Sequence, residues 1–347
     1  MLNGMAMNFR YQHIALGLFA ILGTFVAVFF IPSVPFAEAV TISPVRLELA
    51  ADPGSYARGI VKITNDEPQV RTLFLDAANF ESNDESGEPK FIPGKDNLAG
   101  WVRIQESVTI LGLQSMEVPF TVEVPSAVDP GGYFAAIFAS VVPATPQSGG
   151  EVALRSDVGT LLFFRVNGDF KDGETILEFR TKDNRKVYNS IPVEFMFRFQ
   201  NDGDDRALPV GDITVRNVFG KVTKVIPANP SGGNVLPQSV RRFETAWVNS
   251  AGGKIETNKD LVVYPEFGSF FEAVKYQVQN FALGHYNANL ELTINNDSSR
   301  QYAKSTSFWI IPWQLLVVVA AIIIFFILPL LLLIIVLIAY LKRRQRQ

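Results

Sequence analysis

Short apolar runs separated by turn residues fill the chain between residues 40 and 300. The runs are rich in Val, Ile, Phe and Thr, and some alternate apolar with polar positions, as in residues 193–199 (VEFMFRF). Gly, Pro, Asn and Asp separate the runs, and we find no long stretch with the period of a helix. Period-two alternation between turn residues is typical of β-strands in sandwich-type domains. The pattern therefore predicts an all-β region.

A polar break divides this β region into two predicted sandwich domains. The break at residues 167–173 (NGDFKDG) carries two glycines and no apolar run. We expect the first domain over residues 40–167, the second over residues 174–300, and a hairpin around Phe219-Gly220. The other expected strands lie at residues 40–49, 59–65, 72–76, 101–110, 116–124, 131–139, 159–166, 176–179, 193–199, 243–248, 273–278 and 290–294.

A long apolar run near the C-terminus predicts one transmembrane α-helix. Residues 308–341 contain no Asp, Glu, Lys or Arg, and the basic tail 342–347 follows. About 20 apolar residues cross a bilayer core, and a longer run is accommodated by tilt. Basic residues favour the cytoplasmic side. The sequence thus predicts a single-pass protein of the cell membrane, with a large extracellular N-terminal part, a polar stalk at residues 301–307 and a short cytoplasmic tail.

Aromatic residues flank the predicted span, as they do at membrane interfaces. Pro312 fits the start of the helix, where its missing N–H costs little, and Pro329 should kink the helix in mid-span. The residues expected at the interfaces are Trp309 and Trp313 on the outer side and Tyr340, Lys342, Arg343 and Arg344 on the inner side.

The N-terminus has the features of a secretory signal peptide. Arg10 precedes an apolar run at residues 14–31, and a small-x-small site ends at Ala39. This predicts that residues 1–39 are removed. A retained N-terminal anchor is the alternative, because the apolar run is long for a signal.

Composition excludes several functions. Without the predicted signal and tail, 26 of the 31 Lys and Arg and 33 of the 34 Asp and Glu remain, a net charge near −7. This mildly acidic part argues against nucleic acid as a partner. The chain has no Cys, and His285 is the one histidine outside the predicted signal. A thiol nucleophile, a thiolate metal site and a histidine triad are therefore not expected. We predict no catalytic residue, metal or cofactor.

Short motifs of the first domain resemble those of a known family. They are, in order, Ile42-Ser43-Pro44, Pro53-Gly54, Val61-x-Ile63-x-Asn65, Trp101, Val122-x-Val124-Pro125 and Pro130-Gly131-Gly132-Tyr133. They resemble the N-terminal domain of the WxL-interacting proteins of Gram-positive cell surfaces. Those proteins have a signal peptide, two immunoglobulin-like domains, one C-terminal membrane helix and a basic tail. The first domain also looks distantly like the N-terminal domain of periplasmic pilus chaperones.

The resemblance to WxL-interacting proteins covers residues 42–166 by motif and residues 174–300 by architecture alone. It implies two immunoglobulin-like β-sandwich domains in tandem. It also implies peptidoglycan binding by the first domain and binding of a partner or host surface protein by the second.

Four candidate binding features can be named. Trp101 is either an aromatic platform for a sugar ring or a core residue, and the core is favoured. Tyr133 follows Gly131-Gly132, a pair that indicates a tight turn or a close backbone approach. Asp84 and Glu85 lie in the best candidate for a ligand loop. Whether Ca²⁺ binds the acidic residues 201–205 is left open.

The function expected from these features is a non-enzymatic, membrane-anchored extracellular binding or adhesion protein that recognises cell-wall glycan or a surface protein. The alternative is a membrane-tethered assembly factor, chaperone or scaffold subunit that binds through a β-strand edge. A wall hydrolase is a weaker third alternative. The oligomeric state is left open.

Overall fold

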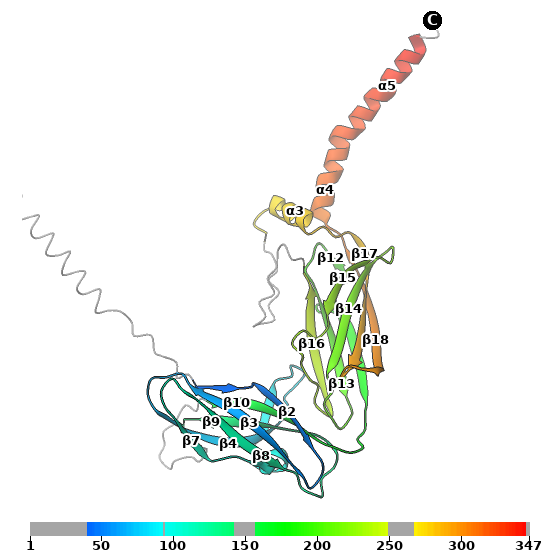
Figure 1. Ribbon diagram of the computed structural model, residues 1–347. Coiled ribbons are helices and arrows are strands. Elements are labelled where there is room, and N and C mark those ends of the chain that lie inside the picture. The colour runs from blue at the N-terminus through cyan, green and yellow to red at the C-terminus, as the bar shows by residue number, and fades with distance from the viewer. Residues whose placement is uncertain (1–39, 93, 142–156, 249–266, 345–347) are drawn as a thin grey trace, which may run out of the picture.

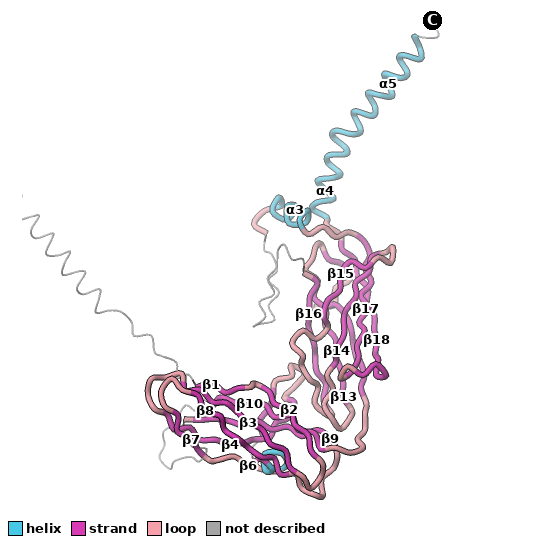
Figure 2. Tube along the Cα trace, in the orientation of Figure 1, coloured by secondary structure: helices cyan, strands magenta, loops and turns pink. Residues whose placement is uncertain are grey.

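The computed structural model describes residues 40–92, 94–141, 157–248 and 267–344 (Figure 1). The predicted signal peptide and residues 345–347 of the tail lie outside this part of the chain. Strands dominate the described residues, and one helix extends from them toward the C-terminus (Figure 2). The all-β prediction with a single C-terminal apolar helix is confirmed at this level.

Two sheets of residues 40–166 enclose one hydrophobic core, and we call this part the first unit. One sheet has the order β1 (Val40–Ser43), β3 (Tyr56–Asn65), β8 (Ser115–Glu123), β6 (Val102–Arg103). The other has the order β2 (Arg46–Ala51), β10 (Asp157–Val166), β9 (Gly131–Ser140), β4 (Arg71–Ser82), β5 (Pro89–Ile92), with β7 (Ser107–Ile110) also on β4; a short helix, α2 (Asn97–Trp101), precedes β6.

The chain changes sheets between β1 and β2, where one continuous strand was predicted over residues 40–49. Pro44 has no N–H to donate to a ladder, and the strand ends at Ser43. Arg46 resumes pairing in the opposite sheet, parallel to β10. As a result β2 is an edge strand.

Residues 174–310 form a second unit with a core of its own. A three-stranded sheet has the order β11 (Glu174–Thr181), β13 (Val193–Asn201), β16 (Ser239–Trp247). The other sheet has the order β12 (Val187–Tyr188), β18 (Asp297–Ile310), β17 (Gly284–Ile294), β14 (Pro209–Asn217), β15 (Val222–Pro227). The predicted hairpin is confirmed, because β14 and β15 pair antiparallel around residues 218–221. An immunoglobulin-like fold for either unit stays a prediction.

The predicted strand at residues 273–278 is wrong, because these residues lie in helix α3 (Phe270–Gln279). The Ser269 hydroxyl accepts a hydrogen bond from the Glu272 N–H, and the Glu272 carboxylate accepts one from the Gly268 N–H. This arrangement is close to a capping box, in which a Ser and a Glu three residues later start a helix.

The predicted stalk at residues 301–307 is also wrong, because these residues belong to β18 and pair along β17. Phe308 is 1% exposed in the second core, and Trp309 pairs with Val187 and His285. The apolar helix starts at Trp313 rather than at residue 308. The error arises because the apolar end of a core strand continues directly into the apolar span.

The C-terminal helix comprises α4 (Trp313–Ile322), a π-helical segment η1 (Ile323–Ile327) and α5 (Leu328–Arg344). At 1.5 Å per residue, its 32 residues extend roughly 48 Å. By length and composition, this is the one helix among the described residues able to cross a membrane. Pro312 immediately precedes it, as expected.

The other expected features of the span are only partly described. Pro329 follows the π-helical segment. Lys342, Arg343 and Arg344 form the last turn, whereas the side chain of Tyr340 lies outside the described part.

Candidate binding site between the two units

The two units meet at an angle, so that loops of the second unit lie against the β2-β10-β9-β4-β5 sheet of the first (Figure 1). Three ion pairs cross the contact: Arg165 with Asp205, Arg206 with Glu48, and Arg198 with Glu85. The Arg165 Nε lies 2.6 Å from an Asp205 oxygen, and the Asp205 side chain is 6% exposed. Opposite charges that are partly shielded from water interact more strongly than exposed pairs. Specific ion pairs therefore stabilise the contact between the two units.

The glycine pair of the first unit makes this close approach possible. Gly131 and Gly132 are the first residues of β9 rather than a tight turn, and the Gly132 N–H donates to the Asp204 carbonyl at 2.9 Å. A Cβ at Gly131 would lie 2.7 Å from the Asp204 carbonyl oxygen, and one at Gly132 would lie 2.6 Å from an Asp205 carboxylate oxygen. The close-approach interpretation is thus the correct one, and the approaching backbone belongs to the second unit.

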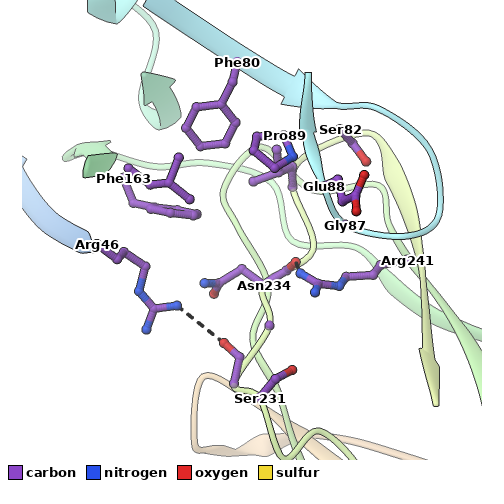
Figure 3. A pocket seen from close by; sticks show the side chains of 14 residues that line it. Arg46, Phe80, Ser82, Gly87, Glu88, Pro89, Phe163, Ser231, Asn234 and Arg241 are labelled. Carbon is purple, nitrogen blue, oxygen red and sulfur yellow. Dashed lines mark hydrogen bonds between the residues drawn. The ribbon is translucent and has the colours of Figure 1, made fainter. Parts of the chain in front are cut away.

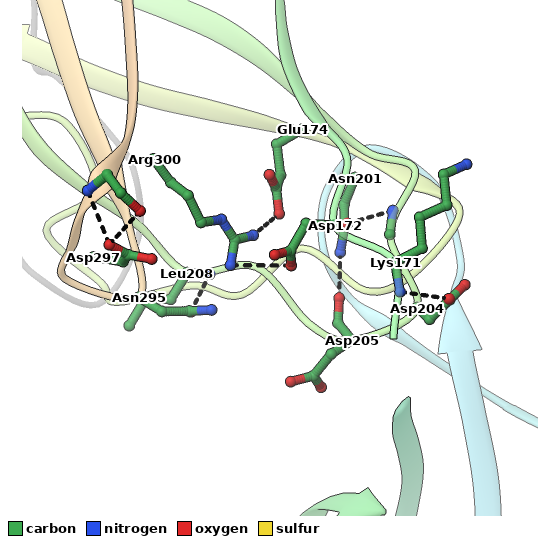
Figure 4. Close-up of polar contacts among 12 residues, drawn as sticks. Lys171, Asp172, Glu174, Asn201, Asp204, Asp205, Leu208, Asn295, Asp297 and Arg300 are labelled. Atoms are coloured by element: carbon green, nitrogen blue, oxygen red, sulfur yellow. Dashed lines mark hydrogen bonds and ion pairs between the residues drawn. The ribbon is translucent and has the colours of Figure 1, made fainter. Parts of the chain in front are cut away.

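The acidic loop 201–205 holds the linker between the units (Figure 4). The Asp204 carboxylate accepts one hydrogen bond from the Lys171 N–H at 3.0 Å, and the Asp204 N–H donates to the Lys171 carbonyl at 2.9 Å. Asn201 donates to the carbonyl of Asp205 at 2.8 Å. The described residues contain no group of three or more His, Cys, Asp or Glu able to hold a metal. The loop therefore has a structural role between the units.

The opposite side of the linker is bound by the start of β18 (Figure 4). The Arg300 guanidinium lies 3.1 Å from an Asp172 oxygen and also contacts the Glu174 carboxylate. Glu174 is 9% exposed. These contacts give the linker defined partners in the second unit.

The predicted ligand loop lies on the second unit instead of standing free. The Glu85 carboxylate accepts two hydrogen bonds from Arg198, one of them at 2.8 Å, and the Glu85 carbonyl accepts one from the Arg242 N–H at 2.7 Å. The hydrogen bond from Arg198 lowers the pKa of Glu85. Asp84 binds Ser86 within the loop, which lowers the Asp84 pKa. Glu85 is therefore an interface residue, and ligand binding by Asp84 stays a prediction.

The core alternative for Trp101 is confirmed. Its side chain is 9% exposed, and its ring lies 4.7 Å from the Tyr133 ring and 6.5 Å from the Phe164 ring between centroids. Tyr133 is half-buried, its hydroxyl donates to the Asp129 carbonyl at 2.9 Å, and burial raises its pKa. A sugar platform at Trp101 would need an open ring face, which the structure does not provide.

A cavity of about 250 Å³ lies between the two units (Figure 3). Phe80 and Phe163 of the first unit form its apolar wall, with ring centroids 5.8 Å apart. They belong to a cluster on the outer face of the sheet, which we call the aromatic face. Its members, which make T-shaped or tilted ring contacts with one another, are Phe80, Phe91, Phe134, Phe138 and Phe163.

Two residues of the opposite wall each contain a buried donor without a partner. Three buried side-chain nitrogens of the described residues lack a hydrogen-bond partner, and two of them, Arg241 Nε and Asn234 Nδ2, belong to residues lining this cavity. The Arg241 Nη1 donates to the Asn234 carbonyl at 2.8 Å, and the guanidinium lies over the Phe243 ring. Burial lowers the pKa of Arg241. No carboxylate of the described residues forms an ion pair with Arg241.

Two glycines leave the space that the Arg241 guanidinium occupies. A Cβ at Gly87 would lie 2.2 Å from Arg241 Cζ, and one at Gly233 would lie 2.6 Å from the same atom. Gly87 comes from the first unit and Gly233 from the second, so the cavity depends on both. Sequence reasoning missed this site, because Arg241 lies in an ordinary strand pattern and its burial depends on distant loops.

An open strand edge runs beside the cavity. The carbonyls of Val45 and Ala51 accept hydrogen bonds from the N–H groups of Leu161 in β10 and of Asn167 just after it. Backbone groups alternate in direction along a strand, so those of Glu48 and its neighbours at positions 46 and 50 point away from β10. On the other side of β2, an open groove of about 820 Å³ is lined by Leu47, Leu49, residues of β3, β6 and β8, and residues 104–105. An unpaired edge of this kind can accept a further strand.

No family model and no curated protein sequence matches the chain. Similar solved structures include the class 5 fimbriae chaperone CfaA, at 12% identity and a TM-score of 0.38, covering 77% of this chain and 99% of that chain. The E. coli chaperone DraB follows at 10% identity and a TM-score of 0.34, covering 78% and 95%. A chain of the Salmonella enterica SafA pilin–SafB chaperone complex has 11% identity and a TM-score of 0.34, covering 78% and 97%.

These similarities assign neither a family nor a function to the chain. The structures named are chaperones or chaperone complexes of pili, so the resemblance to WxL-interacting proteins stays a prediction. The function has to be argued from the geometry of the chain itself.

Proposed function

We propose that the chain is a membrane-anchored, non-enzymatic binding protein that holds an extended, carboxylate-bearing segment of a partner protein. The carboxylate lies in the cavity between the units, and the segment continues along the edge of β2. This is the assembly-factor alternative considered from the sequence, narrowed to one kind of ligand. The observation that carries it is the pair of buried donors, Arg241 Nε and Asn234 Nδ2, beside an apolar wall.

The energetic reason is the cost of an unsatisfied buried donor, about 1–3 kcal/mol for each group and more for a charged one. A carboxylate has two acceptor oxygens and forms strong hydrogen bonds with a guanidinium, so it is the kind of group that would satisfy such donors. It would also neutralise a half-buried cation that has no ion-pair partner among the described residues. The cavity, at about 250 Å³, is smaller than a typical drug-sized site. It therefore suits the end or a single side chain of a longer ligand.

The rest of the ligand would use the surfaces that flank the cavity. The aromatic face offers apolar contact, and Phe91 on it is 44% exposed. The free backbone groups of β2 offer main-chain hydrogen bonds, which give affinity without demanding a particular sequence. Trp101, the aromatic platform expected for a cell-wall glycan, is buried. Glycan binding therefore has no support from this residue and stays a prediction.

The test uses the purified full-length chain in lipid nanodiscs and a fluorescent ten-residue peptide of alternating Val and Thr. Three versions are compared: a free C-terminal carboxylate, a C-terminal amide, and an amide with one internal Asp. The free carboxylate or the Asp version is expected to bind at least about tenfold more tightly than the plain amide, since charge-assisted hydrogen bonds contribute about 1.5–3 kcal/mol. The comparison of the two carboxylates identifies which source the site accepts.

Arg241→Gln is expected to abolish this preference. Arg242→Gln is the matched control, because Arg242 is the next residue, its side chain is 51% exposed and it pairs with Glu244. Equal binding of all three peptides, or equal effects of the two substitutions, would refute the proposal.

A further inference from the structure

Helix α3 buries the polar Gln277 and exposes the large apolar side chains of Phe271 and Val278 beside the charged Glu272 and Lys275. Ala273 and Gln277 are its buried residues, and Asn280, which caps its C-terminus, is 3% exposed. Phe271 is 77% exposed and Val278 is 57% exposed. A surface helix of a soluble domain has the reverse arrangement, with its apolar stripe facing the core. The exposed stripe therefore needs an apolar environment outside the domain.

The buried polar face attaches α3 to the first turn of the apolar helix. The Gln277 side chain donates to the Gln314 side chain at 2.5 Å and accepts from the Leu315 N–H at 2.9 Å. The Phe270 and Trp313 rings are 6.0 Å apart. In Figure 1, α3 lies across the base of α4, at the end of the second unit from which the span emerges. The exposed stripe is thus held at the level where the span begins.

The β14–β15 hairpin brings a second exposed apolar group to the same end. Asn217 pairs with Tyr286, and Gly284, two residues nearer the span, pairs with Ile310. The turn after Asn217 therefore reaches the level at which β18 ends. Phe219 at its tip is 89% exposed.

The hairpin turn is an ordered structure. The Asn217 side chain accepts hydrogen bonds from the N–H groups of Phe219 and Lys221, each at 3.1 Å. The Gly220 N–H donates to the Asn217 carbonyl at 2.9 Å. A hydrogen-bonded turn therefore holds the exposed Phe219 ring in a defined position.

Six large side chains define what we call the end face. Its residues are Phe219, Phe271, Val278, Phe281, Trp309 and Trp313, which are 48–89% exposed. An exposed apolar cluster of this kind usually marks a contact surface. Aromatic residues are enriched where a protein meets the headgroup layer of a bilayer, and a helix with one apolar face can lie in that layer. Lys221 and Lys275 are exposed at the same end and suit lipid phosphates.

We infer that the end face lies in the outer interfacial layer of the bilayer that the C-terminal helix crosses. The inference rests on the membrane anchoring included in the proposed function. The bilayer is favoured over a protein partner because the stripe on α3 is continuous with the base of the span. The second unit would then contact the membrane through α3 and the β14–β15 hairpin, in addition to the helix that crosses it.

This contact would set the height of the binding cavity above the membrane. Only Ile311 and Pro312 separate β18 from the span, so the strand and the helix are closely coupled. The 14 residues of β18 extend roughly 45 Å at about 3.3 Å per residue. The far end of β18 lies at the linker between the units, where Arg300 binds Asp172. The cavity would therefore be held at a defined distance from the lipid surface.

Single cysteines allow a direct test, because the chain has none of its own. Full-length protein is reconstituted into vesicles of four parts phosphatidylcholine to one part phosphatidylglycerol, with an environment-sensitive fluorophore on one cysteine at a time. Val278→Cys and Phe219→Cys report on the end face, and Ile335→Cys reports on the span. Val70→Cys is the matched control, because Val70 is 56% exposed and belongs to the first unit. Quenchers are placed on lipid headgroups or deep in the acyl chains.

The expected result is shallow quenching at positions 278 and 219, deep quenching at 335 and no quenching at 70. Quenching at 335 with none at 278 and 219 would overturn the end-face inference while leaving the anchor intact. No quenching at 335 would overturn the anchor, and the inference with it. If protection at 278 depends on the ratio of protein to lipid, a second copy covers the face and the inference is wrong.

Discussion

Replacing Phe308 with Ala removes a ring that aromatic side chains surround. The Phe308 centroid lies 5.6 Å from that of Phe195, 5.9 Å from those of Tyr188 and Tyr286, and 6.5 Å from that of Trp247. Its exposed fraction is 1%. Truncation of a buried Phe to Ala costs about 3–5 kcal/mol through lost burial and the cavity left behind. For a unit of this size, that corresponds to a drop in Tm of about 10–17 °C.

Trp309→Ala is the matched control, because it truncates the next residue in the same strand. The Trp309 side chain is 48% exposed, and surface substitutions usually change stability by about 0.5 kcal/mol or less. Thermal unfolding of each full-length variant in detergent is followed by near-UV circular dichroism, which reports on packed aromatic side chains. Unfolding of the first unit serves as an internal reference, because neither substitution lies in it.

The reasoning fails if both variants unfold within about 0.5 kcal/mol of the unchanged protein. That result would mean that residue 308 belongs to a span or stalk, as the apolar run by itself indicates. A large loss for Trp309→Ala with none for Phe308→Ala would place the strand in the opposite register, because neighbouring residues of a strand face opposite sides.

Three further predictions concern the interface and α3. Because Arg198 lowers the pKa of Glu85 from 4.5, the pair stabilises the contact above that pH, and the stability is lost as pH falls through the lowered value. Small-angle scattering should show a looser contact between the units in acid, and Glu85→Gln should loosen the contact at neutral pH as well. Gly132→Val should destabilise the contact between the units by about 1–3 kcal/mol through overpacking. Gly173→Ala is the control and should leave the contact unchanged, because a Cβ at Gly173 makes only ordinary contacts. Equal Tm values for the two variants would contradict this. Ser269→Ala should speed hydrogen exchange in α3 by weakening its cap by about 1 kcal/mol, and Ser269→Asp should preserve protection.

Local patterns were enough to predict most of the strands. The alternation in residues 193–199 predicted β13 (Val193–Asn201), and the polar break at residues 167–173 lies between β10 and β11. The same holds for the hairpin at Phe219-Gly220. Each of these depends on the side-chain period of a strand or on turn-forming residues, which are properties of neighbouring residues.

The C-terminal boundary and α3 could not be obtained in this way. Residues 308–310 are apolar whether they close a core or begin a span, and only pairing with β17 distinguishes the two. In α3 the usual signal is inverted, since Gln277 is buried and Phe271 is exposed. The Ser269 and Glu272 cap was a readable signal that the short apolar run obscured.

In the candidate site, too, local sequence identified some residues, but only the tertiary structure showed what they contact. Trp101 and Tyr133 were named from sequence, and the structure places them in or against the first core. Glu85 was named as a ligand residue, and it binds Arg198, 113 positions away in the chain. Arg241 was not named, because its surroundings come from loops of both units.

The sequence by itself determined that this chain is built of β-strands, that it divides near residue 170, and that it ends in an apolar helix followed by basic residues. These properties follow from side-chain periodicity, turn residues and the length of an apolar run. Only the tertiary structure decided where the second unit ends, which residues of α3 are exposed and which cation is half-buried between the units. Burial and ion pairing depend on residues far apart in the chain, and their contacts exist only once both units have folded and met.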